Sequence, residues 1–221
     1  MNLVLSNEIR NAAPSLKVLL VQANIVNEPT CDELWRELST VAERVQQSYE
    51  VDMINKRPAI AATRKAYKAC GKEPNRYRPS SEALCRRMVK GLELYRSLTV
   101  IDLINLLSVA SGHSIGGFDA DKIVGDTLTI GIGREGEPYE AIGRGTLNVA
   151  GLPILRYSIG GIGTPTSDHE RTKLTPETRR LVMVFNIYGD EMPLDDIKIL
   201  TCRLLEQYAH ATDINMQLCN S

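Results

Sequence analysis

Glycine is spread very unevenly along the chain, and this distribution constrains the fold more than any other sequence feature. Of the sixteen glycines in 221 residues, thirteen lie between residues 112 and 163. They are interleaved there with short β-type runs, as at 127–130 and 152–155. Glycine has no Cβ and therefore permits the tight turns that other residues avoid. We predict a sheet of short, mainly antiparallel strands in this part of the chain.

The residues before the glycine-rich part predict a mostly helical half. A run rich in Val, Leu and Ile at 17–26 predicts one strand. Thr30 and Glu33 have the S/T-x-x-E spacing of a capping box, which predicts the start of a helix. Helical patterns occupy the segments 30–49, 59–70, 80–94 and 100–111. The last of these is apolar on nearly every side, so we expect it to be buried.

After the glycine-rich part, the pattern predicts a strand at 181–188 and a helix at 194–211. No repeat and no Pro/Ser-rich linker divides the chain. We therefore predict one α+β domain over residues 1–221, in which a helical N-terminal half packs on a glycine-rich, mainly antiparallel sheet. Within this domain, residues 1–56 form an N-terminal strand–helix extension and residues 191–221 contain a C-terminal helix.

Positive charge is concentrated in one segment, although the formal net charge of the chain is only −1. Residues 56–96 contain twelve Lys or Arg and three acids, Glu73, Glu82 and Glu93. Tyrosines are interleaved with the cations, which favours a surface that neutralises phosphates and stacks on bases. The side chains that we expect to contact nucleic acid are Arg64, Lys65, Lys68, Arg86 and Arg87. Two amphipathic helices with solvated cations would give the same pattern.

The five cysteines are widely spaced and include no C-x-x-C pair, so the sequence predicts neither a zinc site nor dithiol chemistry. Free cysteines are typical of a reducing compartment, and we expect a cytoplasmic protein with no metal and no cofactor. The chain begins without the charged and apolar segments of an export signal, and its most apolar stretch, 98–110, is too short to span a bilayer. We therefore expect no membrane association.

Residues 131–136 match the dinucleotide fingerprint G-x-G-x-x-G literally. The fingerprint needs a helix directly after it, whose N-terminus binds the pyrophosphate. Here Glu137, Pro138 and Tyr139 follow instead. We interpret the segment as a hairpin turn.

The segment 160–172 carries the highest density of chemically useful side chains. It combines glycines and hydroxyls with two carboxylates, Asp168 and Glu170, and it also holds His169 and Arg171. Such a loop suits a polar ligand, although a surface loop that only binds its own backbone would have the same composition. His169 has no partner at metal-ligand spacing, and Ser167, Asp168 and His169 are too close in sequence to form a relay.

One stretch between residues 100 and 123 resembles a known family. The residues that carry the resemblance are Asp102, Asn105, Gly112, Phe118, Asp119, Asp121 and Lys122. They follow the pattern of a helix with an aspartate and an asparagine, then a glycine, then F-D-x-D-K. This pattern is similar to the B3/B4 editing module of the phenylalanyl-tRNA synthetase β subunit. The pair Gly160–Gly161 before a polar loop resembles the active-site turn of that module, and the resemblance covers about residues 57–190.

The resemblance implies an RNA-binding protein that hydrolyses the ester of noncognate aminoacyl-tRNA in trans, as an aminoacyl-tRNA deacylase with tRNA as its partner. Asp168 and Glu170 would act in hydrolysis, and the basic segment would hold the acceptor end of the tRNA. The residues expected to bind the substrate are Asn105, Gly161, Gly163, Thr164, Thr166, Ser167 and Arg171. The sequence departs from the family at Gly116, where the family has histidine, and at Ile104, where it has threonine.

Two other functions remain open from the sequence. One is a non-catalytic module that binds tRNA or another RNA, and the other is a small amino-acid-binding protein whose basic face is incidental. Salt distinguishes the two, because binding through several phosphates weakens steeply as salt rises, whereas a buried small-ligand site responds little.

Overall fold

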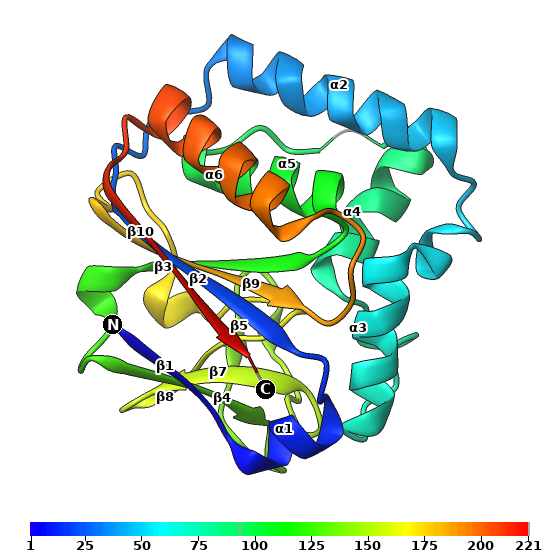
Figure 1. Ribbon diagram of the computed structural model, residues 1–221, viewed down its shortest axis with the longest axis vertical. Coiled ribbons are helices and arrows are strands. Elements are labelled where there is room, and N and C mark those ends of the chain that lie inside the picture. The colour runs from blue at the N-terminus through cyan, green and yellow to red at the C-terminus, as the bar shows by residue number, and fades with distance from the viewer. Residues whose placement is uncertain (93, 221) are drawn as a thin grey trace.

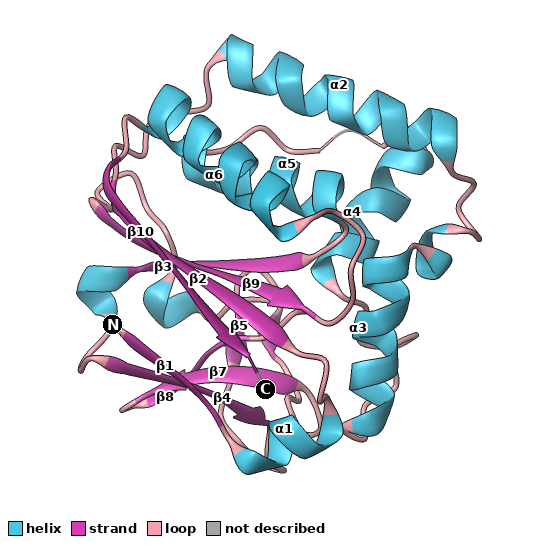
Figure 2. Ribbon diagram, viewed as in Figure 1, coloured by secondary structure: helices cyan, strands magenta, loops and turns pink. Residues whose placement is uncertain are grey.

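The computed structural model describes residues 1–92 and 94–220 and has three layers (Figure 1). Helices α5 (Thr99–Ser111) and α6 (Leu194–Ala209) cover one face of a four-stranded sheet, and α2 (Asp32–Ser48) packs on α5 from outside. A second four-stranded sheet covers the opposite face, so the first sheet is the middle layer (Figure 2). None of the helices in the described part of the chain combines the length and apolar character needed to span a membrane.

The middle sheet has the strand order β10-β2-β9-β3 and is antiparallel throughout. Its strands are β2 (Lys17–Asn24), β3 (Ser114–Asp119), β9 (Arg180–Ile187) and β10 (Thr212–Asn220). Strand β9 is apolar from Leu181 to Phe185 because both of its faces are covered. Met183 and Phe185 point to the helices, whereas Val182 and Val184 point to the second sheet. This alternation separates the two main hydrophobic cores.

The outer sheet has the order β1-β4-β7-β8 and contains the one parallel pairing among the described strands, between β1 and β4. Its strands are β1 (Asn2–Leu5), β4 (Thr127–Ile132), β7 (Pro153–Tyr157) and β8 (Gly160–Gly163). A short ribbon of β5 (Glu140–Ala141) and β6 (Gly145–Thr146) extends beside it. The predicted α+β class with a mainly antiparallel sheet is confirmed.

The remaining helices surround these layers. They are α1 (Asn7–Ala12), α3 (Pro58–Ala69), α4 (Ser80–Val89) and the 3₁₀ turns η1 (Ile54–Lys56), η2 (Ala120–Lys122) and η3 (Glu170–Thr172). Each predicted helix has a counterpart, and most of them keep nearly the predicted bounds. The helix predicted at 80–94 ends earlier, at Val89, and Glu93 lies outside the described residues. Helix α5 ends at Gly112, whose φ of +76° is the left-handed conformation that favours glycine.

The predicted capping box does not form. The residue that precedes α2 is Cys31, and its side chain makes no capping hydrogen bond. Helix α2 begins one residue later than predicted, so Thr30 lies before the N-cap position. Its hydroxyl instead donates to Asp102 Oδ2 at 2.5 Å, on a buried carboxyl group of α5. Thr30 therefore joins α2 to α5.

Three other predictions need correction. The segment 191–221 contains strand β10 as well as helix α6. The segment 1–56 is not an appendage, because β2 is an inner strand of the middle sheet and β1 pairs with β4. The segment 131–136 does turn, but it forms no hairpin: β4 pairs with β7, and the strand after the turn pairs with β6. The turn leads into a separate ribbon, and no helix follows it.

A buried ion pair connects three parts of the helical side of the molecule. Arg57 is 3% exposed and donates from Nε and Nη2 to Glu191 Oε1, at 2.8 and 2.6 Å. Glu191 Oε2 accepts from the backbone N–H of Ala59, in the first turn of α3. Arg57 Nη1 donates to the carbonyl of Val109 on α5. The pair thus fixes α3, α5 and the β9–α6 connection to one another.

His113, between α5 and β3, is fully buried. Neither of its ring nitrogens has a hydrogen-bond partner among the described residues. Burial lowers the pKa of His113 to about 4 from the ordinary 6.5, although the nearby Asp190 opposes the shift. The imidazole is therefore neutral in the native protein at neutral pH.

We expect His113 to make the protein sensitive to acid. Between pH 6.5 and pH 4 the unfolded chain binds a proton at this residue and the native protein does not, so the free energy of unfolding falls as pH falls. The full effect amounts to about 3 kcal/mol. In His113→Leu this contribution is absent, so urea unfolding at pH 7 and pH 4.5 should show a smaller difference than in the wild type. An unchanged difference would mean that His113 is not the group responsible.

Candidate functional site

A hollow of about 230 Å³ lies between α5, β3 and the loops beside them. Its lining consists of Ile101, Ile104, Asn105, Ile115, Gly117, Ile142, Asp168, Lys173 and Leu174. The two predicted site residues Asn105 and Asp168 thus meet at one place, although they are far apart in sequence. Apolar walls with a few polar groups are typical of small-ligand sites.

Asp168 lies at the free edge of the middle sheet. Strand β3 is the last strand of that sheet, so the backbone N–H of Gly117 faces away from β9. This N–H donates to Asp168 Oδ2 at 3.1 Å. Among the described residues no donor lies within hydrogen-bond distance of Asp168 Oδ1. A Cβ at Gly116 would lie 3.0 Å from Oδ1 and one at Gly163 3.2 Å from it, so this oxygen is directed toward the space between β3 and β8.

The surroundings of Asp168 favour its protonated form. Burial raises the pKa of Asp168 to about 7, and the hydrogen bond from the Gly117 N–H offsets only part of that effect. No cation forms an ion pair with this carboxyl group within the described chain. At neutral pH the group is thus divided between its charged and neutral forms, which suits a residue that accepts and returns a proton.

The backbone of β3 can approach Asp168 closely because two of its residues are glycines. A Cβ at Gly116 would lie 2.7 Å from Phe118 Cζ and 3.0 Å from Asp168 Oδ1. A Cβ at Gly117 would clash with Ile104 Cδ1. A side chain at either position would displace its neighbours, and Phe118 and Asp168 occupy the space that a side chain at residue 116 would fill.

The F-D-x-D-K motif has a structural role. Phe118 packs in the core between the two sheets. Asp119 accepts from the Thr178 hydroxyl at 2.9 Å and from the backbone N–H of Asp121, at the start of η2. Lys122 forms an ion pair with Asp119 at 3.3 Å. The motif thus anchors the end of β3 and holds the glycines next to Asp168.

The hydroxyls of the polar loop mostly bind the loop itself. Thr164 Oγ1 accepts from the backbone N–H groups of Thr166 and Ser167, and it donates to the Ser167 carbonyl. The Thr166 hydroxyl pairs with Tyr67 on α3 at 2.8 Å. Tyr139 donates to the carbonyl of Ser167. None of the three predicted substrate-binding residues of this turn lines the hollow. Their hydrogen bonds instead fix the conformation of the loop that carries Asp168.

The glycines of β8 also lie away from the hollow. A Cβ at Gly161 would be 2.5 Å from Ile154 Cδ1, and a Cβ at Gly163 would be 2.5 Å from Phe118 Cζ. These two glycines are needed for close packing between the strands. The backbone donor nearest to Asp168 is Gly117, on a different sheet, which the sequence did not single out.

Glu170 and Arg171 lie outside the hollow as well. Glu170 forms an ion pair with Lys173 at 2.6 Å, and this contact lowers the pKa of Glu170. Arg171 donates from its backbone N–H to His169 Nδ1 at 2.9 Å. Of the two predicted catalytic carboxylates, only Asp168 lines the hollow. The two residues diverge because the backbone of Asp168 pairs with Gly163, whereas Glu170 begins the turn η3 with a side chain that is 36% exposed.

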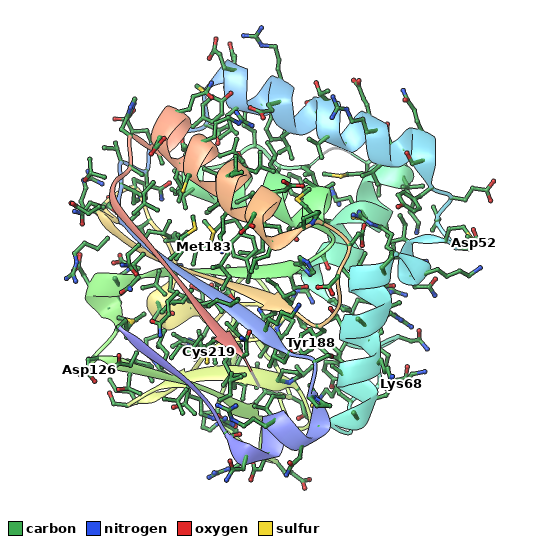
Figure 3. All side chains as sticks on the ribbon, viewed as in Figure 1. Asp52, Lys68, Asp126, Met183, Tyr188 and Cys219 are labelled. Atoms are coloured by element: carbon green, nitrogen blue, oxygen red, sulfur yellow. The ribbon has the colours of Figure 1, made fainter. Side chains whose placement is uncertain are left out.

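The predicted nucleic-acid contacts divide into two groups. Arg64 pairs with the buried Glu82 at 2.8 Å, and Arg86 donates to the carbonyl of Val51, so these two side chains stabilise the fold. Lys65 and Lys68 are exposed on α3, and Figure 3 shows Lys68 pointing to solvent. Arg87 lies over the ring of Tyr95, which is 80% exposed.

The sequence did not identify the apolar part of the lining. Ile101 and Ile104 are three residues apart on α5, and this spacing places them on one face. Ile142 is an exposed isoleucine in the turn between β5 and β6. An apolar residue is unusual in such a turn and could have indicated a ligand site. Its backbone N–H donates to the carbonyl of Asp168 at 3.0 Å, which fixes the turn against the site. Within residues 1–92 and 94–220, no group of three or more His, Cys, Asp or Glu could hold a metal ion.

Comparisons with known proteins relate this chain to a family of domains. Residues 62–192 match the family model of the B3/4 domain, and this segment contains Asn105, Gly117 and Asp168. No curated protein matches the chain. Among solved structures, the fold is similar to an N-terminal fragment of the phenylalanyl-tRNA synthetase β subunit from Pyrococcus horikoshii, with 10% identity and a TM-score of 0.50. The match covers 100% of this chain and 54% of that one, so the chain spans about half the length of the fragment. The predicted resemblance is confirmed, and the chain belongs to the B3/4 domain family.

Proposed function

We propose that the protein hydrolyses the ester bond of noncognate aminoacyl-tRNA in trans, with the aminoacyl group in the hollow. The observation that carries the proposal is Asp168, a carboxyl group that lines an apolar hollow and has a pKa of about 7. A general base works best when its pKa is near the pH at which it operates. The relation to the synthetase β subunit supports tRNA as the carrier of the ester.

In the proposed reaction Asp168 accepts a proton from a water molecule as the water oxygen bonds to the ester carbonyl carbon. The Asn105 amide, which also lines the hollow, donates to the carbonyl oxygen as negative charge develops on it. When the bond to the ribose oxygen breaks, Asp168 returns the proton to that oxygen. The products are a free amino acid and uncharged tRNA, and the reaction uses neither a metal nor a cofactor. Charged tRNA is a cytoplasmic substrate, so the proposal implies a cytoplasmic protein.

The tRNA backbone would bind to the exposed cations of the basic segment. Lys65 and Lys68 lie on the solvent side of α3, and the exposed Tyr95, under the half-buried Arg87, adds a ring. The loop that docks on α3 through Thr166 and Tyr67 is the loop that carries Asp168. A tRNA bound along α3 would thus contact the element that supports the hollow.

We expect Lys65→Glu and Lys68→Glu to weaken tRNA binding by a similar factor for every tRNA sequence, because phosphate contacts carry no sequence information. Each lost phosphate contact should reduce the slope of log affinity against log salt by about 1. Filter binding at several salt concentrations measures both quantities. Lys198→Glu, the same change on α6, serves as the control and should bind as the wild type does. Equal affinities for all three variants and the wild type would exclude α3 from the interface.

The second candidate is a module that binds charged tRNA without hydrolysing it. The observation in its favour is Gly116, which provides no side chain at the position where the family has histidine. The two functions are distinguished by incubating the protein with a panel of correctly and incorrectly charged tRNAs and measuring the release of amino acid, with parallel samples that lack protein. Rapid release from a mischarged tRNA supports hydrolysis. No release from any of them, with salt-sensitive binding intact, supports the binding module and excludes hydrolysis.

A further inference from the structure

We infer that the hollow selects an aliphatic aminoacyl group and not a hydroxyl-bearing one, an inference that rests on the proposed function. The walls that a side chain would contact are entirely aliphatic. They consist of Ile101, Ile104, Ile115, Ile142 and Leu174, and no aromatic side chain contributes to the lining. These five residues come from α5, β3, the β5–β6 turn and the segment after η3. The apolar lining is therefore not simply the apolar face of a single helix.

The aliphatic residues are positioned to be covered by a ligand. Ile104, Ile115 and Leu174 are each 8% exposed, and Ile142 at the mouth of the hollow is 39% exposed. The hydrogen bond from the Ile142 backbone to the Asp168 carbonyl keeps this isoleucine at the mouth. A branched aliphatic group in the hollow would remove these surfaces from water, which is the main favourable contribution in an apolar site.

The polar groups of the hollow are all assigned to other partners. Asp168 and Asn105 act on the water and on the ester carbonyl in the proposed reaction. The ammonium group of Lys173 binds Glu170 Oε2 and the Lys122 ammonium binds the Lys173 carbonyl. No polar side chain of the lining is left to bind a hydroxyl group of the substrate.

A substrate hydroxyl would therefore lose its hydrogen bonds to water without replacement. An apolar pocket rejects an isostere that adds one hydroxyl by about 10²-fold, so valyl esters should react about 10²-fold faster than threonyl esters. A site that binds a phenol hydroxyl has the opposite behaviour and favours tyrosine over phenylalanine by roughly 10⁴-fold or more. We expect tyrosyl esters to react no faster than phenylalanyl esters.

The test uses one tRNA charged chemically or by a ribozyme with valine, isoleucine, threonine, phenylalanine or tyrosine, so that the RNA part is constant. Single-turnover hydrolysis is measured for each ester, and binding is measured for stable amides of the same amino acids on 3′-amino-3′-deoxyadenosine. Valine and isoleucine esters should react fastest, and their amides should bind most tightly.

If esters are cleaved but the tyrosyl ester reacts faster than the phenylalanyl ester, or the threonyl ester reacts as fast as the valyl ester, the inference is wrong and the proposed function stands. If no ester is cleaved but the aliphatic amides bind most tightly, the proposed function is wrong and the selectivity stands. If no ester is cleaved and the aliphatic amides bind no more tightly than the others, both the proposed function and the selectivity are wrong.

Ile142→Ser tests the assignment of the hollow with little risk to folding, because this side chain is exposed. Its matched control is Ile159→Ser, which changes an isoleucine that is 61% exposed in the turn between β7 and β8 and does not line the hollow. Ile142→Ser should lower kcat/KM for the isoleucyl ester by about tenfold, and Ile159→Ser should leave it unchanged. Equal values for the two variants would overturn the assignment of this hollow as the side-chain site.

Discussion

Replacing Asp168 with asparagine should slow the release of amino acid from a mischarged tRNA by about 10²–10⁴-fold, the usual contribution of a general base. An asparagine side chain can still accept the hydrogen bond from the Gly117 N–H, so the loop keeps its position while the proton acceptor is lost. Single-turnover hydrolysis at saturating protein measures the effect. Asp52→Asn, at an exposed carboxylate of the turn before η1, should retain the wild-type rate. A wild-type rate in Asp168→Asn would remove Asp168 from the mechanism.

The same substitution should stabilise the folded protein at alkaline pH. The pKa of Asp168 is about 7 in the native protein against an ordinary value of 3.8. As pH rises between these values, the unfolded chain loses a proton that the native protein keeps, so the free energy of unfolding falls, and above pH 7 the full cost is present. Because Asp168 is partly exposed, we expect the cost to be on the order of 3 kcal/mol. Urea unfolding should show Asp168→Asn more stable than the wild type at pH 8 and equal to it below pH 4.

A residue that lowers stability where it supports activity is a common property of active sites. Opposite effects of Asp168→Asn on rate and on stability would indicate that the carboxyl group is retained for function. A loss of both would indicate a purely structural residue.

The second large effect is expected at the buried ion pair. Glu191→Ala leaves the Arg57 guanidinium buried without a counter-charge and removes the acceptor of the Ala59 N–H. Breaking a buried pair by removing one partner typically costs 3–5 kcal/mol, and we expect a loss of about 4 kcal/mol in the free energy of unfolding. Urea denaturation measures it directly.

Two further variants make this result specific. Asp190→Ala removes the neighbouring acid, which forms an ion pair with Lys17; the side chains of Lys17 and Asp190 are 44% and 85% exposed. This substitution should lower the free energy of unfolding by less than about 1 kcal/mol. The double variant Arg57→Met/Glu191→Leu removes both charges and should recover much of the loss, because well-packed apolar residues can replace a buried pair. A double variant as unstable as Glu191→Ala would show that the loss comes from packing and not from the unpaired charge.

Much of the fold could be predicted from the sequence because its signals are local. The apolar periodicity of α2 and α6, the almost entirely apolar helix α5 and the apolar run 181–185 in β9 are each signals within about ten to twenty residues. Strand β10 was missed although a local signal existed: Ile214, Met216 and Leu218 alternate with polar residues, as in a strand with one covered face. The helical pattern before it was extended too far, and the left-handed residue His210, with a φ of 47°, ends the helix one position after Ala209.

The site could be predicted only in part because its geometry depends on contacts between distant segments. The sequence drew attention to both Asp168 and Glu170, and no local property distinguishes two acids two positions apart. The distinction comes from the middle sheet, where β3 is an edge strand and Gly117 offers its N–H to Asp168.

The order of strands in the middle sheet also determines when the protein can fold during its synthesis. Strand β2 leaves the ribosome early, but both of its neighbours, β9 and β10, come from the last quarter of the chain, and Lys17 pairs with Ile187. Until then, β2 exposes an apolar strand with two unpaired edges, a state that promotes aggregation. The nascent chain can therefore complete the middle sheet only by a slow pairing between strands that are far apart in sequence. A chaperone that bound β2 would contact a segment that lies outside the B3/4 match.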